Sequence, residues 1–188
     1  MKRFGIAPFS LIVGLGITNV QAQDAGKWTG AYGGLTFSKS SGDMIYDDGG
    51  VFDLDGQARG AVLGYNYANG AWVFGAELAY SKGRIEEVGN TDFGFESALD
   101  LKARAGYAMG NALFYGTLGA TATQWDEGGS SFGGNGVLYG VGVDYLVSSN
   151  FFVGAEYVAR NVTSDWNAGG STLDADMNTL SFRAGIKF

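Results

Sequence analysis

The chain has 188 residues, of which 33 are glycine and none is cysteine or histidine. These absences exclude disulfides, thiol nucleophiles, histidine-based catalytic triads and histidine-ligated metals, so we expect no enzyme activity, no cofactor and no metal site. The formal net charge of -7 argues against a nucleic-acid partner, which needs a basic surface. An apolar content of 46% is too high for a disordered glycine-rich chain.

The N-terminus has the order of a secretory signal. Met1-Lys2-Arg3 is the positive start, residues 4–20 are largely apolar, and Val20-Gln21-Ala22 precedes the expected cleavage before Gln23. The alternative is a single membrane anchor, but Pro8 and several small residues make the apolar segment weak as a span. We therefore predict a signal peptide at 1–22 and one further domain at 23–188.

The rest of the chain alternates polar and apolar side chains with a period of two, as β-strands do. Turn-forming residues bound eight such segments, approximately 28–38, 57–67, 71–81, 97–107, 112–122, 137–147, 151–160 and 178–188. Long and short connections alternate, so short turns gather at one end and long loops at the other. This pattern is typical of outer-membrane barrels, and segments of about ten residues suit tilted spanning strands. The predicted fold is all-β: an eight-stranded antiparallel up-and-down transmembrane β-barrel.

One face of the predicted strands carries nearly all of their charges. A cation that faces lipid at mid-bilayer costs about 2–4 kcal/mol, so the charged face should line the lumen. The predicted lumenal charges are Glu77, Asp100, Lys102, Arg104, Asp144, Glu156, Arg160, Arg183 and Lys187. Arg59 is the exception, because it lies on the apolar face near the long-loop end. There it either meets lipid phosphates or is a solvated rim residue.

The lumenal charges should neutralise one another. Buried charges persist only when they are paired, and the interior of an eight-stranded barrel is about filled by its own side chains. We therefore predict a polar plug with cross-strand ion pairs, Glu77 with Lys102 and Glu156 with Arg183. The alternative is a narrow gated conductance in which these pairs exchange partners.

Aromatic residues on the opposite face gather near the strand ends, as expected for interfacial girdles. Those near the short turns are Tyr67, Trp72, Tyr107, Tyr145 and Phe151, and those near the long loops are Phe37, Tyr80 and Tyr139.

Several short motifs carry a family resemblance. They include Trp28-Thr-Gly-Ala-Tyr-Gly-Gly34, Val73-Phe-Gly-Ala-Glu77, Ala103-Arg-Ala-Gly-Tyr107, Gly154-Ala-Glu-Tyr157 and Phe182-Arg-Ala-Gly-Ile-Lys-Phe188. In their order and spacing, over essentially all of 27–188, the chain resembles the opacity-type, outer membrane protein A-like (porin-like) family of eight-stranded Gram-negative outer-membrane barrels. The resemblance implies a surface antigen of the outer membrane. It also implies a C-terminal signal, Phe182, Ile186 and Phe188, that the barrel-insertion machinery reads.

The long loops are acidic; residues 39–56, for example, set Lys39 against five aspartates. They are either a solvated surface, a divalent-cation bridge to lipopolysaccharide, or a contact for a host or extracellular ligand. The predicted function is therefore that of an integral outer-membrane protein, structural or surface-interacting, with a narrow porin-like conductance at most and with lipid and lipopolysaccharide as partners. Alternatives are a conduit for small hydrophobic molecules, which needs an apolar lumen, and a soluble secreted lipocalin-like barrel, which needs inverted faces.

Overall fold

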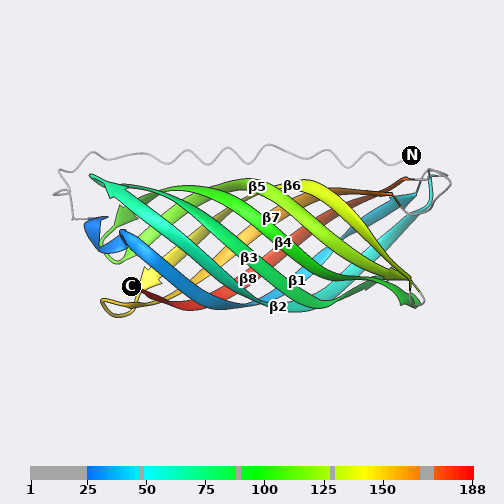
Figure 1. Cartoon of the computed structure of the whole chain (residues 1–188), viewed down its shortest axis with the longest axis horizontal. Coiled ribbons are helices and arrows are strands. Elements are labelled where there is room, and N and C mark those ends of the chain that lie inside the picture. Colours follow the sequence, from blue (N-terminus) through cyan, green and yellow to red (C-terminus); the bar gives the residue numbers. More distant parts are fainter. Residues whose placement is uncertain (1–24, 47–48, 88–89, 128–129, 166–171) are drawn as a thin grey trace.

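A computed structural model describes residues 25–46, 49–87, 90–127, 130–165 and 172–188, so the predicted signal peptide lies outside the described residues. The described elements are a short 3-10 helix, η1 (Ala25–Trp28), and the strands β1 (Gly30–Tyr46), β2 (Val51–Asn69), β3 (Trp72–Glu87), β4 (Asn90–Met109), β5 (Ala112–Glu127), β6 (Ser130–Leu146), β7 (Phe151–Asp165) and β8 (Thr172–Lys187). Each strand pairs antiparallel with its chain neighbours, and β8 pairs with β1 to close the barrel (Figure 1). The predicted fold class is confirmed. No helix in these residue ranges is long and apolar enough to cross a membrane.

The strands are longer than predicted, and the predicted long loops are therefore wrong in extent. β1 continues to Tyr46 and β2 begins at Val51, so most of the segment 39–56 is a paired hairpin. The reason is that the alternation continues beyond the membrane-spanning segment: Met44 and Leu54 point inward and are buried, while their polar neighbours point outward. The polar residues of this segment suggest a loop, but every second residue is directed inward, as in a strand.

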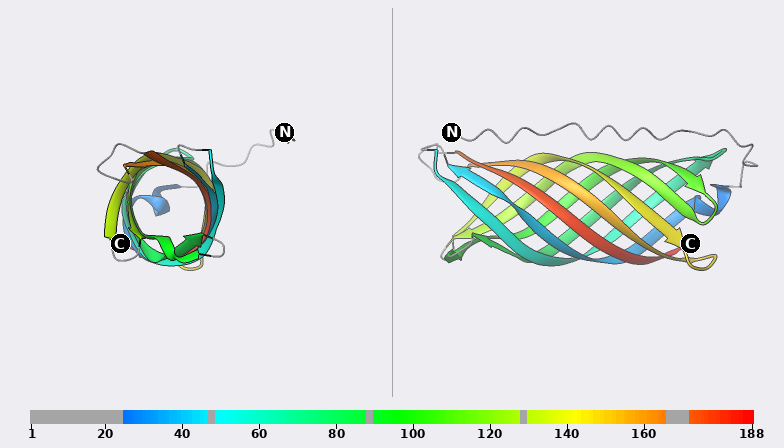
Figure 2. Two further views of the ribbon diagram at one scale, coloured as in Figure 1. Left: turned by 90° about the vertical axis from the view of Figure 1, so that its right-hand side faces the viewer. Right: turned by 180° about the vertical axis from the view of Figure 1, so that it is seen from behind.

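The two ends of the barrel differ in their connections. The short-turn end holds the turns between β2 and β3, β4 and β5, and β6 and β7, together with η1 and Phe188 (Figures 1 and 2). Gly70 and Gly110 adopt φ values of 62° and 60° in two of these turns, a conformation that glycine adopts without strain. We call the opposite end the long-loop end.

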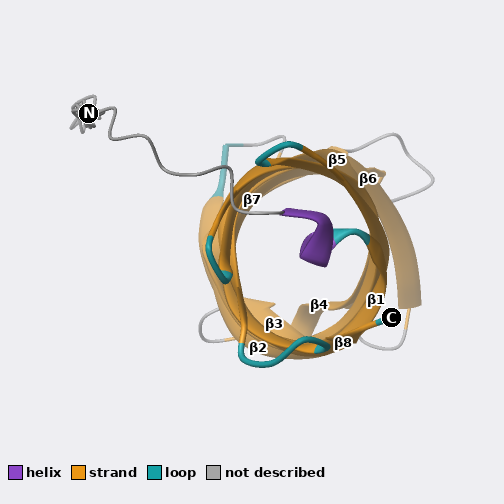
Figure 3. Ribbon diagram, turned by 90° about the vertical axis from the view of Figure 1, so that its left-hand side faces the viewer, coloured by secondary structure: helices purple, strands orange, loops and turns teal. Residues whose placement is uncertain are grey.

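The outward face is apolar, and this contradicts the lipocalin-like alternative. Leu35, Leu63 and Val141 expose 72%, 62% and 65% of their surface, as expected of side chains that contact lipid. Two apolar clusters also lie inside the lumen, which sequence analysis did not predict. One surrounds η1 at the short-turn end and includes Trp28, and the other lies at the long-loop end around Trp125. Figure 3 shows η1 within the ring of strands.

Candidate functional site: the charged layer of the lumen

Charged side chains from five strands meet between the two apolar clusters. Strand alternation points them inward: Glu77 from β3, Lys102 and Arg104 from β4, Asp144 from β6, Glu156 from β7 and Arg183 from β8, all of them buried. Glu77 lies directly opposite Lys102 in the β3–β4 register. A layer of this kind is stable only if its charges neutralise one another.

Glu77 is the centre of this layer. Its carboxylate accepts from Lys102 Nζ at 2.6 Å, from Arg183 Nη2 at 2.6 Å and from Arg104 Nη1 at 3.2 Å. The Tyr32 hydroxyl donates to the same carboxylate at 2.8 Å and accepts from Arg104 at 2.6 Å. Three cations thus share one fully buried carboxylate.

Two further carboxylates balance those cations. Lys102 also contacts Glu156 at 2.8 Å, and Arg104 contacts Asp144 at 2.6 Å. Arg183 Nε lies 3.4 Å from the Asp144 carboxylate. The result is a closed cluster of three cations and three anions that spans the lumen.

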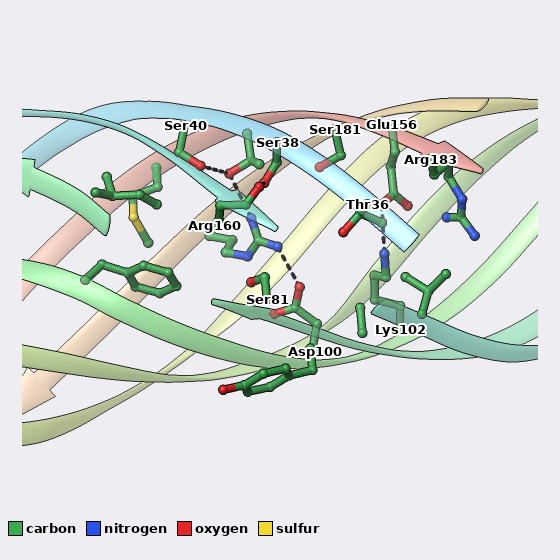
Figure 4. A pocket seen from close by; sticks show the side chains of 18 residues that line it. Thr36, Ser38, Ser40, Ser81, Asp100, Lys102, Glu156, Arg160, Ser181 and Arg183 are labelled. Atoms are coloured by element: carbon green, nitrogen blue, oxygen red, sulfur yellow. Dashed lines mark hydrogen bonds and ion pairs between the residues drawn. The ribbon is translucent and has the colours of Figure 1, made fainter. Parts of the chain in front are cut away.

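A second ion pair lies toward the long-loop end. Arg160 contacts Asp100 at 2.6 Å and donates to Thr179 at 2.9 Å, while Thr121 donates to Asp100 at 2.6 Å. A cavity of about 40 Å³ lies beside this pair and the Lys102–Glu156 pair, and hydroxyl, charged and apolar side chains all line it (Figure 4). The serine and threonine side chains in its wall are Thr36, Ser38, Ser40, Ser81, Thr179 and Ser181. A space of this size with several polar groups in its wall suits water rather than a small hydrophobic molecule.

Two tyrosines support the arginines, and sequence analysis missed both. The Arg104 guanidinium carbon lies 3.7 Å from the ring centroid of Tyr115 and 5.4 Å from that of Tyr32, distances at which cation–π attraction operates. Glycines on neighbouring strands make room for them: a Cβ at Gly64 or Gly142 would lie 2.4 Å from the ring of Tyr32 or Tyr115 respectively. The signal that could have identified these tyrosines is their inward position in the alternation.

Eight of the nine predicted lumenal charges take part in these contacts. Of the two predicted pairs, Glu77 with Lys102 is present and Glu156 with Arg183 is not. Glu156 pairs with Lys102 instead of Arg183, because the long Arg183 side chain reaches across the lumen to Glu77 and Asp144. Lys187 joins none of these ion pairs among the described residues. Its ammonium lies near the short-turn end and donates to the carbonyl of Thr29 at 3.1 Å.

The predicted girdle residues and the predicted C-terminal signal all lie on the outward face. The girdle residues Phe37, Tyr67, Trp72, Tyr80, Tyr107, Tyr139, Tyr145 and Phe151 are exposed, as are Phe182, Ile186 and Phe188. Trp72 and Tyr107 pack edge to face with their ring centroids 5.4 Å apart. Their interfacial and signalling roles stay predictions.

A match to a family model establishes what kind of protein this is. Residues 10–188 match the family described as "outer membrane protein beta-barrel domain". The chain belongs to this family. A 22 kDa outer membrane protein of Rhizobium leguminosarum bv. viciae is 29% identical, with 87% of this chain and 80% of the relative covered. A 25 kDa outer-membrane immunogenic protein of Brucella canis is 27% identical, over 87% and 78% of the two chains.

Solved structures show the same fold as this outer-membrane protein. The crystal structure of Neisserial surface protein A is 20% identical with a TM-score of 0.54, and it covers 85% of this chain and 98% of its own. Ail, the attachment invasion locus protein of Yersinia pestis, is 20% identical with a TM-score of 0.52, covering 85% and 99%. The protein is therefore a Gram-negative outer-membrane barrel.

Proposed function

We propose that this outer-membrane barrel is closed to ions. We also propose that its long-loop end faces the cell exterior, the usual orientation of outer-membrane barrels, and that the protein acts through the surface at this end. The observation that carries the proposal is the charged layer, in which three cations and three anions are buried between two apolar clusters, together with the neighbouring Arg160–Asp100 pair. A buried charge that is left without its partner costs about 3–5 kcal/mol, so an ion that displaces a member of this layer meets a high barrier. The same charges argue against a conduit for small hydrophobic molecules.

Planar-bilayer recording of the refolded protein tests the closed lumen. We expect no steady conductance from the wild type, and none from Glu156→Gln, because the apolar clusters at both ends stay in place. Heat-modifiable gel mobility verifies that each variant is folded before it is recorded. A steady conductance in the folded wild type would contradict the proposal.

A gated conductance is the second candidate, and the sharing of Lys102 favours it. Its ammonium contacts both Glu77 and Glu156, at 2.6 and 2.8 Å, so it could leave one partner without losing the other. Folded Glu77→Gln or Glu156→Gln that conducts where the wild type is silent would establish the gate. Unchanged silence in both variants would exclude it.

The hairpins at the long-loop end are the proposed contact surface for lipopolysaccharide and for an extracellular or host ligand. Asp43, Asp53, Asp174 and Asp176 are exposed there, on β1, β2 and β8. The name of the Brucella relatives, immunogenic outer-membrane proteins, supports the display of such hairpins at the cell surface. Shortening the β1–β2 hairpin and measuring cell or matrix adhesion tests this proposal, since equal adhesion by both forms would contradict it.

Two processing steps complete the proposal. The signal peptide at 1–22 directs export, and Phe182, Ile186 and Phe188 present an outward apolar edge that the barrel-insertion machinery recognises. Replacing Phe188 with Ser should slow insertion into the outer membrane. The check is the folded fraction in isolated outer membranes after a short induction.

A further inference from the structure

The outward-facing cations of the barrel are gathered on one side. The described strands carry nine lysines and arginines, of which five are directed into the lumen. The other four, Lys39, Arg59, Lys82 and Arg84, point outward, and all lie on the adjacent strands β1, β2 and β3. On β8, which borders β1 on the other side, the outward charges are Asp174 and Asp176. The clustering of cations is therefore local.

Strand register orders these outward residues into rows that run from the membrane toward the hairpin tips. The row Leu35–Ala61–Tyr80 is apolar, and the next row is Phe37–Arg59–Lys82. The row Lys39–Gln57–Arg84 follows, and beyond it lies Ser41–Asp55–Glu86. The order is thus lipid-facing, then cationic over two rows, then acidic. We call the two middle rows the basic band.

This order matches the chemistry of the outer leaflet. Tyr80, which belongs to the predicted girdle, lies in the row next to the band on its membrane side, and the girdle residue Phe37 lies in the first row of the band itself. Girdle aromatics lie at the level of the lipid headgroups, so side chains one row further out reach the phosphates. On β1, β2 and β3, the outward acidic residues begin only beyond the band.

Two cations in the band, Arg59 and Lys82, lie side by side, and Arg59 has no carboxylate partner among the described residues that would offset their repulsion. Arg59 and Lys82 are directly opposite in the β2–β3 register, an arrangement that destabilises a sheet when both residues carry the same charge. Arg59 is exposed and has no ion-pair partner among the described residues. A bound anion would relieve this repulsion, and a guanidinium binds phosphate with two parallel hydrogen bonds.

The existing partners of the band are exchangeable. Lys82 contacts Glu96 at 2.9 Å and Lys39 contacts Asp55 at 3.4 Å, but both lysine side chains are more than 60% exposed. Exposed ion pairs contribute little to stability, so a phosphate can replace the carboxylate at small cost. The lumenal cations have no such freedom, because their partners are buried with them.

We propose that the basic band is a binding site for the phosphate groups of an outer-leaflet glycolipid, with Arg59 and Lys82 as its main ligands. The glycolipid's acyl chains would pack on the apolar row below, against Leu35 and Tyr80. The proposal gives a specific site for the lipopolysaccharide contact proposed above. It rests on the proposed orientation of the barrel, in which the long-loop end faces the cell exterior.

Native mass spectrometry of the barrel in detergent micelles tests this site, with bis-phosphorylated lipid A as the probe. We expect the double variant Arg59→Gln with Lys82→Gln to bind lipid A about tenfold more weakly than the wild type, through loss of charge-assisted hydrogen bonds. The matched control is Gln124→Glu with Asn135→Asp, which changes the net charge equally on the distant strands β5 and β6. This control should bind like the wild type.

Two further probes distinguish the source of the phosphate. Dephosphorylated lipid A should bind weakly and equally to all three proteins, and millimolar inorganic phosphate should leave the lipid A complex intact. Equal binding by the double variant, equal loss in the control, or displacement by free phosphate would each overturn the proposal. Conductance is recorded separately, so failure here is distinguishable from failure of the closed-lumen proposal.

Discussion

Four of the five lumenal cations on the described strands form ion pairs, and the four cations of the outer wall lie in very different surroundings. Lys102, Arg104, Arg160 and Arg183 contact buried carboxylates, and of the four only Arg160 is partly exposed. On the outer wall, Lys39, Lys82 and Arg84 contact exposed or half-exposed carboxylates, and Arg59 has no ion-pair partner in the described ranges. Burial therefore decides whether a cation is fixed in the structure or available to a ligand, and variants on both sides test this difference.

The largest effect is expected at the centre of the lumen. Replacing Glu77 with Ala leaves three buried cations with one fewer carboxylate and should lower the free energy of unfolding by about 3–5 kcal/mol. Urea unfolding of the refolded protein measures the loss. Glu96→Ala, which removes an outer-wall carboxylate, is the control and should leave the unfolding midpoint unchanged. Similar unfolding midpoints for both variants would contradict the proposed difference between the lumen and the outer wall.

A smaller loss is expected for the second lumenal pair. Asp100→Asn removes the charge that faces Arg160, whose side chain is 12% exposed and can reach solvent. We expect a destabilisation of about 2–3 kcal/mol, below that of Glu77→Ala, because only one cation loses its partner. The measurement is the same urea titration, and a larger loss than at Glu77 would contradict the ranking.

Two glycine variants compare the lumen with the outer wall through packing alone, without a change in charge. A Cβ at Gly142 would lie 2.4 Å from the Tyr115 ring and displace the support of Arg104, so Gly142→Ala should cost about 1–3 kcal/mol. Gly116 faces outward, and a Cβ there would lie 3.9 Å from the carbonyl oxygen of Gly140 on the neighbouring strand. Gly116→Ala should therefore be neutral. The reverse order of stability would show that the outer wall is the more tightly constrained one.

The smallest change in stability, and a gain in binding, is expected on the outer wall. Glu96→Gln frees Lys82 from its exposed partner. The unfolding midpoint should stay the same, while lipid A should bind more tightly in native mass spectrometry. Unchanged or weaker binding would indicate that Glu96 positions Lys82 rather than competing with phosphate.

Sequence periodicity predicts the barrel well because each strand residue has only two possible directions. The strand number, the antiparallel order and the inward direction of the charges all follow from this alternation. Pairing inside the lumen does not, because it depends on how far each side chain reaches across the barrel. Arg183 illustrates this: its nearest β7 neighbour in register is Gly154, and its contacts are Glu77 and Asp144 on more distant strands.

Two other features were not predicted from the sequence. The alternation places Tyr32 and Tyr115 on the inward face, but it does not show that their rings lie against the Arg104 guanidinium. η1 is a four-residue element, too short for any periodicity, and its position inside the barrel depends on contacts with distant residues such as Lys27 with Asn111. The alternation of polar and apolar residues therefore predicts the strands of the barrel wall, but it does not predict the contacts inside the lumen.

The seam between β1 and β8 has a consequence for how the barrel folds. It joins the two ends of the described chain: Tyr32 lies opposite Lys187, and the Phe188 amide donates to the Ala31 carbonyl at 2.8 Å. Pairing of residues so distant in sequence carries a large loop-closure entropy and makes closure slow. Until β8 arrives, β1 presents an unpaired edge to which other chains can add. The order of strand arrival during biogenesis is thus a determinant of aggregation.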